Sequence, residues 1–366
     1  MRLQDICEIN PRIPRIDDDT EVSFVPMTSV SEDGEIDTSD IRPYIDVKKG
    51  YTSFKEDDVL FAKITPCMEN GKGAIARGLK NGYGCGSSEF HVLRTKGQVM
   101  PEWIYYLTSW SYFRREAEKH MTGSAGQRRV PKLYLENYEI RLPELSDQEY
   151  QVQTLTHIKE VIDYRKAELV AFEELTKARF IEMFGDPILN SKHLETKELK
   201  EVLTLKAGDF TAASDISNEP SEMKPYPCYG GNGIRGYVSD YNQDGEYSLV
   251  GRQGALSGNV QFARSKFKNT EHALLVTPII EMNSIWLNQL LQNLDLKRFQ
   301  TGAAQPGLSV KNLQNIPIIC VPIDEQRRFA EYIGIVDKSK LLEERQVGFI
   351  AKISQKPGRQ IKLLSI

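Results

Sequence analysis

Two long stretches of the chain carry apolar residues at helical spacing. The seven-residue spacing is carried by Leu155, Ile162 and Leu169 in the first stretch, joined by Ile158 and Phe172. In the second stretch it is carried by Ile335, Leu342 and Phe349, beside Phe329, Ile333 and Val336. This spacing is typical of helices that pack along an apolar seam. The simplest arrangement buries the two seams against each other, as an antiparallel, coiled-coil-like pair. Alternatively, each helix packs on its own globular domain.

Local signals set the limits of these helices. Ser146 and Glu149 form a capping-box pattern just after a proline, and the second helix begins near Asp324. Gly185 and Pro187 predict the end of the first helix. Without a glycine or proline between 146 and 184, that helix would be about 58 Å long at the α-helical rise of about 1.5 Å per residue.

The remaining segments favour short strands. Runs rich in β-branched and aromatic residues at 22–26, 59–64 and 90–93 are separated by Gly, Asn and Asp turns, and 195–320 follows the same plan. The fold class is therefore α+β, with two strand-rich domains separated by the two long helices.

The chain also contains an internal sequence repeat. Thr122-Gly123-Ser124-Ala125 returns as Thr301-Gly302-Ala303-Ala304, 179 positions later. Leu135, Asn137, Ile140, Asp147 and Gln148 return as Leu313, Asn315, Ile318, Glu325 and Gln326, 178 positions on. Further upstream, Trp103 aligns with Trp286 and Glu89 with Glu271. A period this long indicates a tandem repeat of a whole domain and its connecting helix, with pseudo-two-fold symmetry.

The repeat divides the chain into predicted segments. These are a first domain (1–144), a first long helix (145–186), a second domain (187–322), a second long helix (323–356) and a tail (357–366). Two similar domains suit a partner that offers two half-sites.

The distribution of charge matters more than its sum. The chain of 366 residues has a net charge of −4. However, no acidic residue occurs between 248 and 270, and basic residues outnumber acids between 62 and 96. Such clusters can present basic faces to phosphate groups in an acidic protein. The alternative is ordinary solvated surface charge, but a basic cluster in both repeats weakens it.

Several kinds of chemistry find no support in the sequence. No phosphate-binding loop, methyl-donor fingerprint, metal-ligand pattern or local catalytic signature is present, so we expect no cofactor and no metal. Five scattered cysteines indicate reduced thiols, and no apolar run approaches the length of a membrane span. A cytoplasmic, non-catalytic protein without a membrane partner is expected.

Glycine-rich polar loops in both halves supply residues suited to DNA. Arg and Lys fit guanine, and Asn and Gln fit adenine. The predicted base contacts are Lys63, Arg77, Arg128, Asn232, Arg252, Gln253 and Asn259. The predicted phosphate contacts are Lys72, Lys80, Arg264, Lys266 and Lys268. Ordinary hairpin turns remain the alternative for any one loop.

Taken together, these segments resemble the specificity (S) subunits of type I restriction-modification systems. The resemblance is carried by Pro322-Ile-Asp-Glu-Gln-Arg-Arg328 with its counterpart Pro143-Glu-Leu-Ser-Asp-Gln148, by the Thr-Gly segments, by Phe180-Ile-Glu-Met-Phe-Gly-Asp-Pro187, and by 58–65 and 229–234. It implies two target recognition domains held apart by two antiparallel helices, each domain reading half of a bipartite double-stranded DNA site.

The same resemblance implies the partners. Two modification (methyltransferase) subunits would dock on this chain, and restriction subunits would join through them. A specificity subunit of another restriction class remains an alternative, as does a stand-alone enzyme that holds a nucleotide in its glycine-rich loops.

Overall fold

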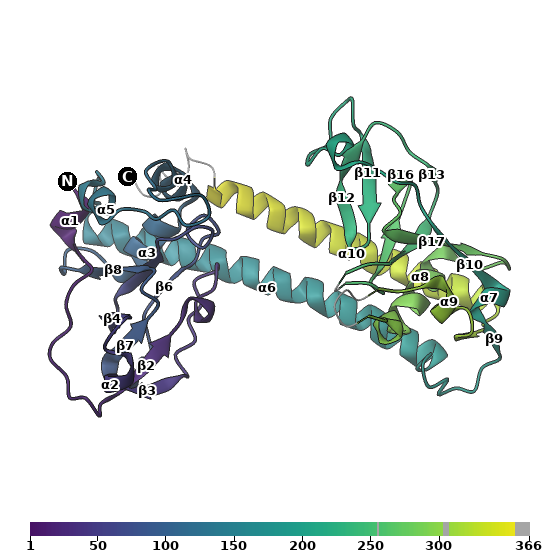
Figure 1. Cartoon of the computed structure of the whole chain (residues 1–366), viewed down its shortest axis with the longest axis horizontal. Coiled ribbons are helices and arrows are strands. Elements are labelled where there is room, and N and C mark those ends of the chain that lie inside the picture. The colour runs from purple at the N-terminus through teal and green to yellow at the C-terminus, as the bar shows by residue number, and fades with distance from the viewer. Residues whose placement is uncertain (255, 303–306, 356–366) are drawn as a thin grey trace. The chain divides into compact units, whose positions relative to one another are not determined.

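The computed structural model describes residues 1–254, 256–302 and 307–355 and divides into two compact units. Unit 1 contains Met1–Lys166 and the chain from Arg345 onward, and unit 2 contains Ala167–Glu344. The division falls inside the first long helix, so this helix contributes residues to both units (Figure 1). The predicted tail 357–366 lies outside the described residues, as do Ala303, Ala304 and the side chain of Phe349.

Unit 1 combines two four-stranded sheets with short helices. Its helices are α1 (Leu3–Ile6), α2 (Tyr44–Val47), α3 (Pro101–Ser109), α4 (Ser111–Lys119), α5 (Lys132–Asn137) and the first part of α6 (Leu145–Phe184). Its strands are β1 (Cys7–Ile9), β2 (Glu21–Val25), β3 (Ile41–Pro43), β4 (Thr52–Lys55), β5 (Val59–Ala62), β6 (Gly73–Ile75), β7 (Tyr83–Gly86) and β8 (Phe90–Thr95). The strands predicted at 22–26, 59–64 and 90–93 are thus present as β2, β5 and β8.

Unit 2 contains the end of α6 and a similar series of helices and strands. Its helices are α7 (Leu199–Val202), α8 (Ser284–Asn293), α9 (Val310–Leu313) and most of α10 (Ile323–Gln355). Its strands are β9 (Thr196–Glu198), β10 (Leu203–Ala207), β11 (Tyr226–Gly230), β12 (Gly233–Val238), β13 (Gln243–Asp244), β14 (Tyr247–Gly251), β15 (Val260–Ala263), β16 (Lys266–Asn269), β17 (Ala273–Pro278) and β18 (Pro317–Ile319).

The sheet topology confirms the internal repeat. The order β1-β8-β5-β6 in unit 1 corresponds to β10-β17-β14-β15 in unit 2, and β3-β2-β7-β4 corresponds to β12-β11-β16-β13. Even the parallel pairing recurs, between β2 and β7 and between β11 and β16. Each unit is therefore one copy of the same α+β fold.

A glutamine near the start of each long helix forms a hydrogen bond to the backbone of its domain, and the two glutamines occupy equivalent positions in the repeat. Gln148 Oε1 accepts a hydrogen bond from the backbone N–H of Met100, which precedes α3, at 3.1 Å. Gln326 Oε1 accepts one from the backbone N–H of Asn283, which precedes α8, at 2.9 Å. Both glutamines are buried. The repeat seen in the sequence at these positions is thus a repeat of packing.

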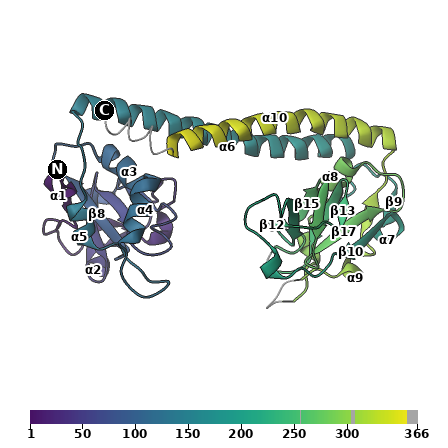
Figure 2. The ribbon, with the colours of Figure 1, turned by 90° about the horizontal axis from the view of Figure 1, so that it is seen from above.

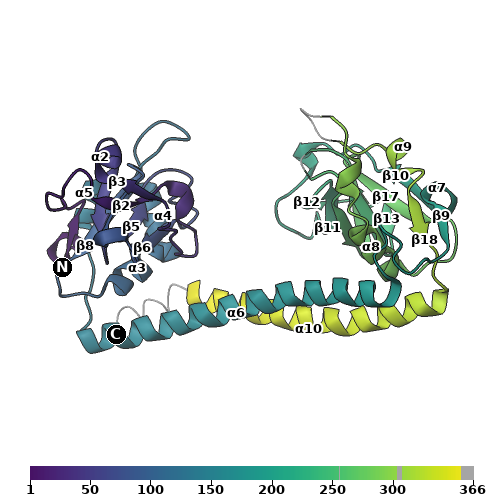
Figure 3. The same cartoon turned by 90° about the horizontal axis from the view of Figure 1, so that it is seen from below.

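Within unit 2, the two long helices run antiparallel (Figures 2 and 3). The Phe180 and Phe329 rings meet edge to face with centroids 5.5 Å apart, and both side chains are fully buried. Farther along, Glu173 accepts a hydrogen bond from Lys340 at 3.3 Å. Contacts that move backward along α6 while they move forward along α10 define antiparallel helices.

Two predictions about these helices were wrong in detail. The exposed fractions of Ile335 and Leu342 are 67% and 59%, so this seam faces away from the core of unit 2. Ile333 and Val336, which the sequence also offered beside this seam, are the residues that are buried. Residues two positions apart point about 200° apart around a helix, and a seven-residue spacing alone does not identify the buried face.

The capping prediction also needs correction, because α6 begins at Leu145 and Ser146 lies inside its first turn. The backbone N–H of Gln148 donates to the carbonyl of Glu144 at 2.9 Å. The side chain of Gln148, which donates from Nε2 to the carbonyl of Pro143 at 3.0 Å, contacts the backbone at the start of the helix in place of the predicted serine cap.

Candidate nucleic-acid interface

One backbone arrangement recurs in both units, directly after the central strand. In unit 1, the N–H of Lys63 donates to the carbonyl of Glu89 at 2.9 Å, and its own carbonyl accepts from Val130 at 2.9 Å. In unit 2, Arg252 makes the corresponding bonds, to His272 at 2.9 Å and from Leu308 at 2.8 Å. Lys63 and Arg252 therefore occupy equivalent positions at the ends of β5 and β14.

A hairpin beside each strand end completes this arrangement. Thr122 and Arg129 exchange backbone hydrogen bonds of 3.0 and 2.8 Å, and Thr301 and Gly307 exchange two of 2.9 Å. The repeated Thr-Gly segments seen in the sequence begin these hairpins.

The backbone pairing corrects one detail of the sequence alignment. Ala62 pairs with Phe90, and Gly251 pairs with Ala273. Glu89 therefore corresponds to His272 rather than to the predicted Glu271. A one-residue error in a strand matters, because neighbouring side chains point to opposite faces.

The side chains of Lys63 and Arg252 are available to a partner. Arg252 is exposed and Lys63 half-buried. Neither side chain has a hydrogen-bond or ion-pair partner among the residues that the structure describes. Burial lowers the pKa of Lys63, although the nearby Glu89 carboxylate opposes this effect. A cation whose side chain makes no hydrogen bond or ion pair with a described residue thus stands at the same place in each unit.

In unit 2, three more predicted base contacts gather around Arg252. Gln253 follows it directly, and its Oε1 lies 2.9 Å from His272 Nδ1. Asn259 Nδ2 donates to Asn232 Oδ1 at 3.1 Å. A side chain at Gly231 would come within 3.1 Å of the carbonyl of His272, so glycine permits the close approach of this loop.

In unit 1, Lys72 and Arg128 join Lys63 in a corresponding cluster. The carbonyl of Lys72 accepts from Ala62, and that of Arg128 accepts from Thr65. Their side chains are engaged, however. Lys72 Nζ donates to the carbonyl of Met27 at 3.0 Å, and Arg128 lies 3.4 Å from the Glu118 carboxylate.

The side chains of the other predicted DNA contacts have partners within the protein. Arg77 follows β6, whose end pairs with the start of β5, and it forms ion pairs with Asp57 and Glu102. Lys80 lies 3.3 Å from Glu21. In unit 2, Lys268 pairs with Asp240 at 2.5 Å, and the Lys266 ammonium lies 4.7 Å from the centre of the Tyr241 ring.

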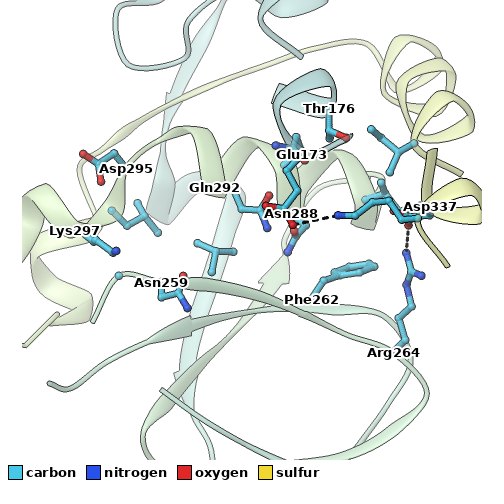
Figure 4. Close-up of a pocket in the computed structure, with 17 residues that line it drawn as sticks. Glu173, Thr176, Asn259, Phe262, Arg264, Asn288, Gln292, Asp295, Lys297 and Asp337 are labelled. Carbon is cyan, nitrogen blue, oxygen red and sulfur yellow. Dashed lines mark hydrogen bonds and ion pairs between the residues drawn. The ribbon is translucent and has the colours of Figure 1, made fainter. Parts of the chain in front are cut away.

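Arg264 lies at the far end of β15 and lines a cavity of about 680 Å³ (Figure 4). Its guanidinium bonds to Asp337 of α10 at 3.1 Å. Asn259 and the ion pair of Glu173 with Lys340 line the same cavity. Arg264 thus connects the sheet of unit 2 to its long helix, and this role competes with a phosphate contact.

Sequence reasoning did not identify the buried polar groups that hold the loops around the strand end of unit 1. Arg114 is buried, and its Nη1 donates to the carbonyl of Met68 at 2.6 Å. His91 is buried as well, with Nε2 2.8 Å from the carbonyl of Val130 and Nδ1 3.1 Å from Asn10 Nδ2. Burial lowers the pKa of His91 to about 4. No local motif marks such residues, because their partners are carbonyls far away in sequence.

Neither a metal cluster nor a membrane-spanning helix occurs among the residues that the structure describes. No group of His, Cys, Asp and Glu side chains in this part of the chain could hold a metal ion. None of its helices is both long enough and apolar enough to cross a membrane.

Comparison with known proteins decides the family. The model of the type I restriction modification DNA specificity domain matches residues 1–174 and again 191–347, so it covers both repeats. The chain belongs to this family. The specificity subunit of the type I restriction enzyme EcoAI of Escherichia coli is 44% identical over 161 residues, which cover 43% of this chain and 27% of that protein.

Two further Escherichia coli proteins agree. The EcoEI specificity subunit is 42% identical over 164 residues, covering 44% of this chain and 27% of that protein. The EcoprrI specificity subunit is 39% identical over 159 residues, covering 42% of this chain and 39% of that protein. The matched stretches thus span well under half of each relative.

Solved structures support the fold over the whole chain. A chain from a structure of the type I R-M system has a TM-score of 0.60 at 18% identity, covering 100% of this chain and 96% of its own. The type I restriction-modification S subunit from M. genitalium has a TM-score of 0.56 at 14% identity, covering 100% of this chain and 94% of its own.

Proposed function

We propose that this chain is the DNA sequence-specificity subunit of a type I restriction-modification complex. The proposal rests on one observation. Each of the two equivalent units has a cation at the end of its central strand, and the side chain of this cation forms no ion pair or hydrogen bond with a described residue. A reader of a bipartite site needs the same reading position twice, and a basic side chain there suits guanine or phosphate.

In this proposal, the segments 1–144 and 187–322 are the target recognition domains, and each reads one half-site in the major groove. Lys63 and Arg252 are the leading base contacts. The remaining predicted phosphate contacts have partners within the protein, which they must exchange or share when DNA binds.

The chain itself is proposed to lack catalysis, with chemistry supplied by two modification subunits and, through them, restriction subunits. Support comes from apolar side chains on the long helices that unit 2 leaves uncovered. On α10, Ile335, Leu341 and Leu342 are exposed, as are Val170 and Leu175 on α6. An exposed apolar stripe is typical of a surface that another subunit covers.

An exchange of recognition segments tests the proposal. Residues 195–315 are replaced by the matching region of a relative, and the chimaera is expressed with its modification subunit. The methylated motif should then change in one half only. A change in both halves, or in neither, would contradict the assignment of one half-site to each unit.

Two further measurements test the partners. The purified chain alone should transfer no methyl group from a labelled donor to DNA, and adding the modification subunit should restore transfer. Ile335→Glu with Leu342→Glu should reduce co-purification of that subunit, whereas Glu344→Gln on the same helix should not. Methyl transfer by the chain alone would favour the rival stand-alone enzyme.

A further inference from the structure

His272 occupies a position that holds a polar side chain in both units. Its equivalent in unit 1 is Glu89, whose two carboxylate oxygens accept hydrogen bonds from Arg129 at 2.9 and 2.8 Å. In unit 2, His272 Nδ1 instead lies 2.9 Å from Gln253 Oε1. Each residue directly precedes the strand that pairs with the central one, β8 or β17, and its carbonyl accepts a hydrogen bond from the backbone of the strand-end cation.

The contact with His272 determines the orientation of the side-chain carboxamide of Gln253. An amide oxygen only accepts hydrogen bonds, so the ring nitrogen Nδ1 is the donor. The planar carboxamide then directs its amino group away from the imidazole. The other ring nitrogen, Nε2, lies 3.1 Å from Glu271 Oε1 and donates to it only when the imidazole carries a proton on both nitrogens.

The backbone around Gln253 is fixed as well. The peptide N–H of Arg252 donates to His272, and Gln253 pairs with Gly307 of the neighbouring hairpin. The side chain is exposed, so its contact with His272 limits the rotamers that remain open. A side chain that is oriented before binding loses less conformational entropy when it binds.

We propose that His272 is a positioning residue that orients the Gln253 carboxamide, so that its amino group meets a hydrogen-bond acceptor on a base edge of the second half-site. The inference rests on the proposed function, because it requires that unit 2 reads DNA. His272 itself touches no base in this scheme.

Two variants of similar size separate the two ring nitrogens. The amide nitrogen of His272→Asn stands where Nδ1 stands, and that of His272→Gln stands where Nε2 stands. The full complex with its modification subunit is presented with duplexes varied at every position of both half-sites, and relative affinities are measured by competition.

We expect His272→Gln to reduce discrimination at one base pair of the second half-site by about fivefold or more, the lower end of what a good side-chain–base contact supplies. His272→Asn should retain most of the discrimination. Preferences in the first half-site should not change. In a Gln253→Ala background, His272→Gln should have no further effect.

The experiment distinguishes failure of the positioning role from failure of the proposed function. If Asn and Gln at position 272 act alike, or if the effect persists without the Gln253 side chain, the positioning role is overturned. It is also overturned if Gln253→Ala leaves the preference intact. A parent complex without any base preference would instead refute the proposed function, and Arg252→Ala serves as the positive control for the second half-site.

Discussion

Substitution of the strand-end cations, Lys63 and Arg252, should change DNA binding without changing the stability of the fold. Lys63 and Arg252 donate no side-chain hydrogen bond within the described parts of the chain. Truncating either to alanine therefore removes no internal hydrogen bond, and the free energy of unfolding should change by less than about 0.5 kcal/mol. Any larger change in DNA binding then belongs to the interface.

The expected magnitude follows from the chemistry of the two side chains. A guanidinium fork on guanine contributes about 1–3 kcal/mol of discrimination, so Arg252→Ala should relax preference at one base pair about 5- to 150-fold. Lys63 is a single ammonium group, so its removal should have an effect near the lower end. If either residue contacts phosphate instead, affinity for all sequences should fall and the salt slope should decrease by about 0.9.

The assay measures relative affinity for every single-base variant of the bipartite site at two salt concentrations. Arg252→Ala should affect the second half-site only and Lys63→Ala the first only. Arg77→Ala is the matched comparison, because its ion pairs with Asp57 and Glu102 lie beyond the opposite end of β5. If Arg77→Ala relaxes base preference while Lys63→Ala does not, the proposal that bases are contacted from the C-terminal ends of β5 and β14 is wrong.

Three further predictions concern charge, acidity and packing. Changing Arg264, Lys266 and Lys268 together to alanine should reduce the salt slope by about 0.9 for each phosphate that these side chains neutralise in the parent, and an unchanged slope would remove them from the interface. Since the pKa of His91 is lowered to about 4, the unfolded chain takes up a proton first as the pH falls. His91 should contribute a decrease in stability of up to about 3 kcal/mol between about pH 6.5 and 4 in urea denaturation, and His91→Leu should remove this contribution. Phe329→Ala should lower the unfolding free energy of unit 2 by about 3–5 kcal/mol in the same assay, because the ring is fully buried; a decrease below about 1 kcal/mol would contradict this packing.

The sequence was sufficient for the plan of the fold because its strongest signals are local. Uninterrupted helical spacing predicted both long helices to within one residue at their starts, and the repeated Gln148 and Gln326 marked equivalent packing positions. The seven-residue spacing of Ile335 and Leu342 did not identify the buried face of α10, whereas Ile333 and Val336, predicted beside it, are buried. Ile333 and Ile335 are chemically identical, and only the surrounding domain decides which of them is covered.

The candidate site could be predicted by residue type but not by grouping. Arg252, Gln253 and Asn259 were recognisable between glycines, and the structure brings them together. Arg77 and Arg264 looked equally suitable, yet each pairs with an acid that lies far from it in the chain. The side chains that compensate a charge come from other elements, so a basic residue in the sequence does not by itself identify an exposed charge.

Under the proposed function, the comparison of the two strand ends explains how one fold would read two different sequences. Hydrogen bonds between backbone groups define the position of Lys63 and Arg252, and these bonds are the same in both units. The side chains around that position differ, with Glu89 beside Lys63 and His272 beside Arg252. Since backbone bonds place few demands on side-chain identity, substitutions at these positions can alter base preference while the strand end stays in place. Specificity would then change through a few side chains in each unit, while the buried glutamines and aromatic residues that hold the long helices stay the same.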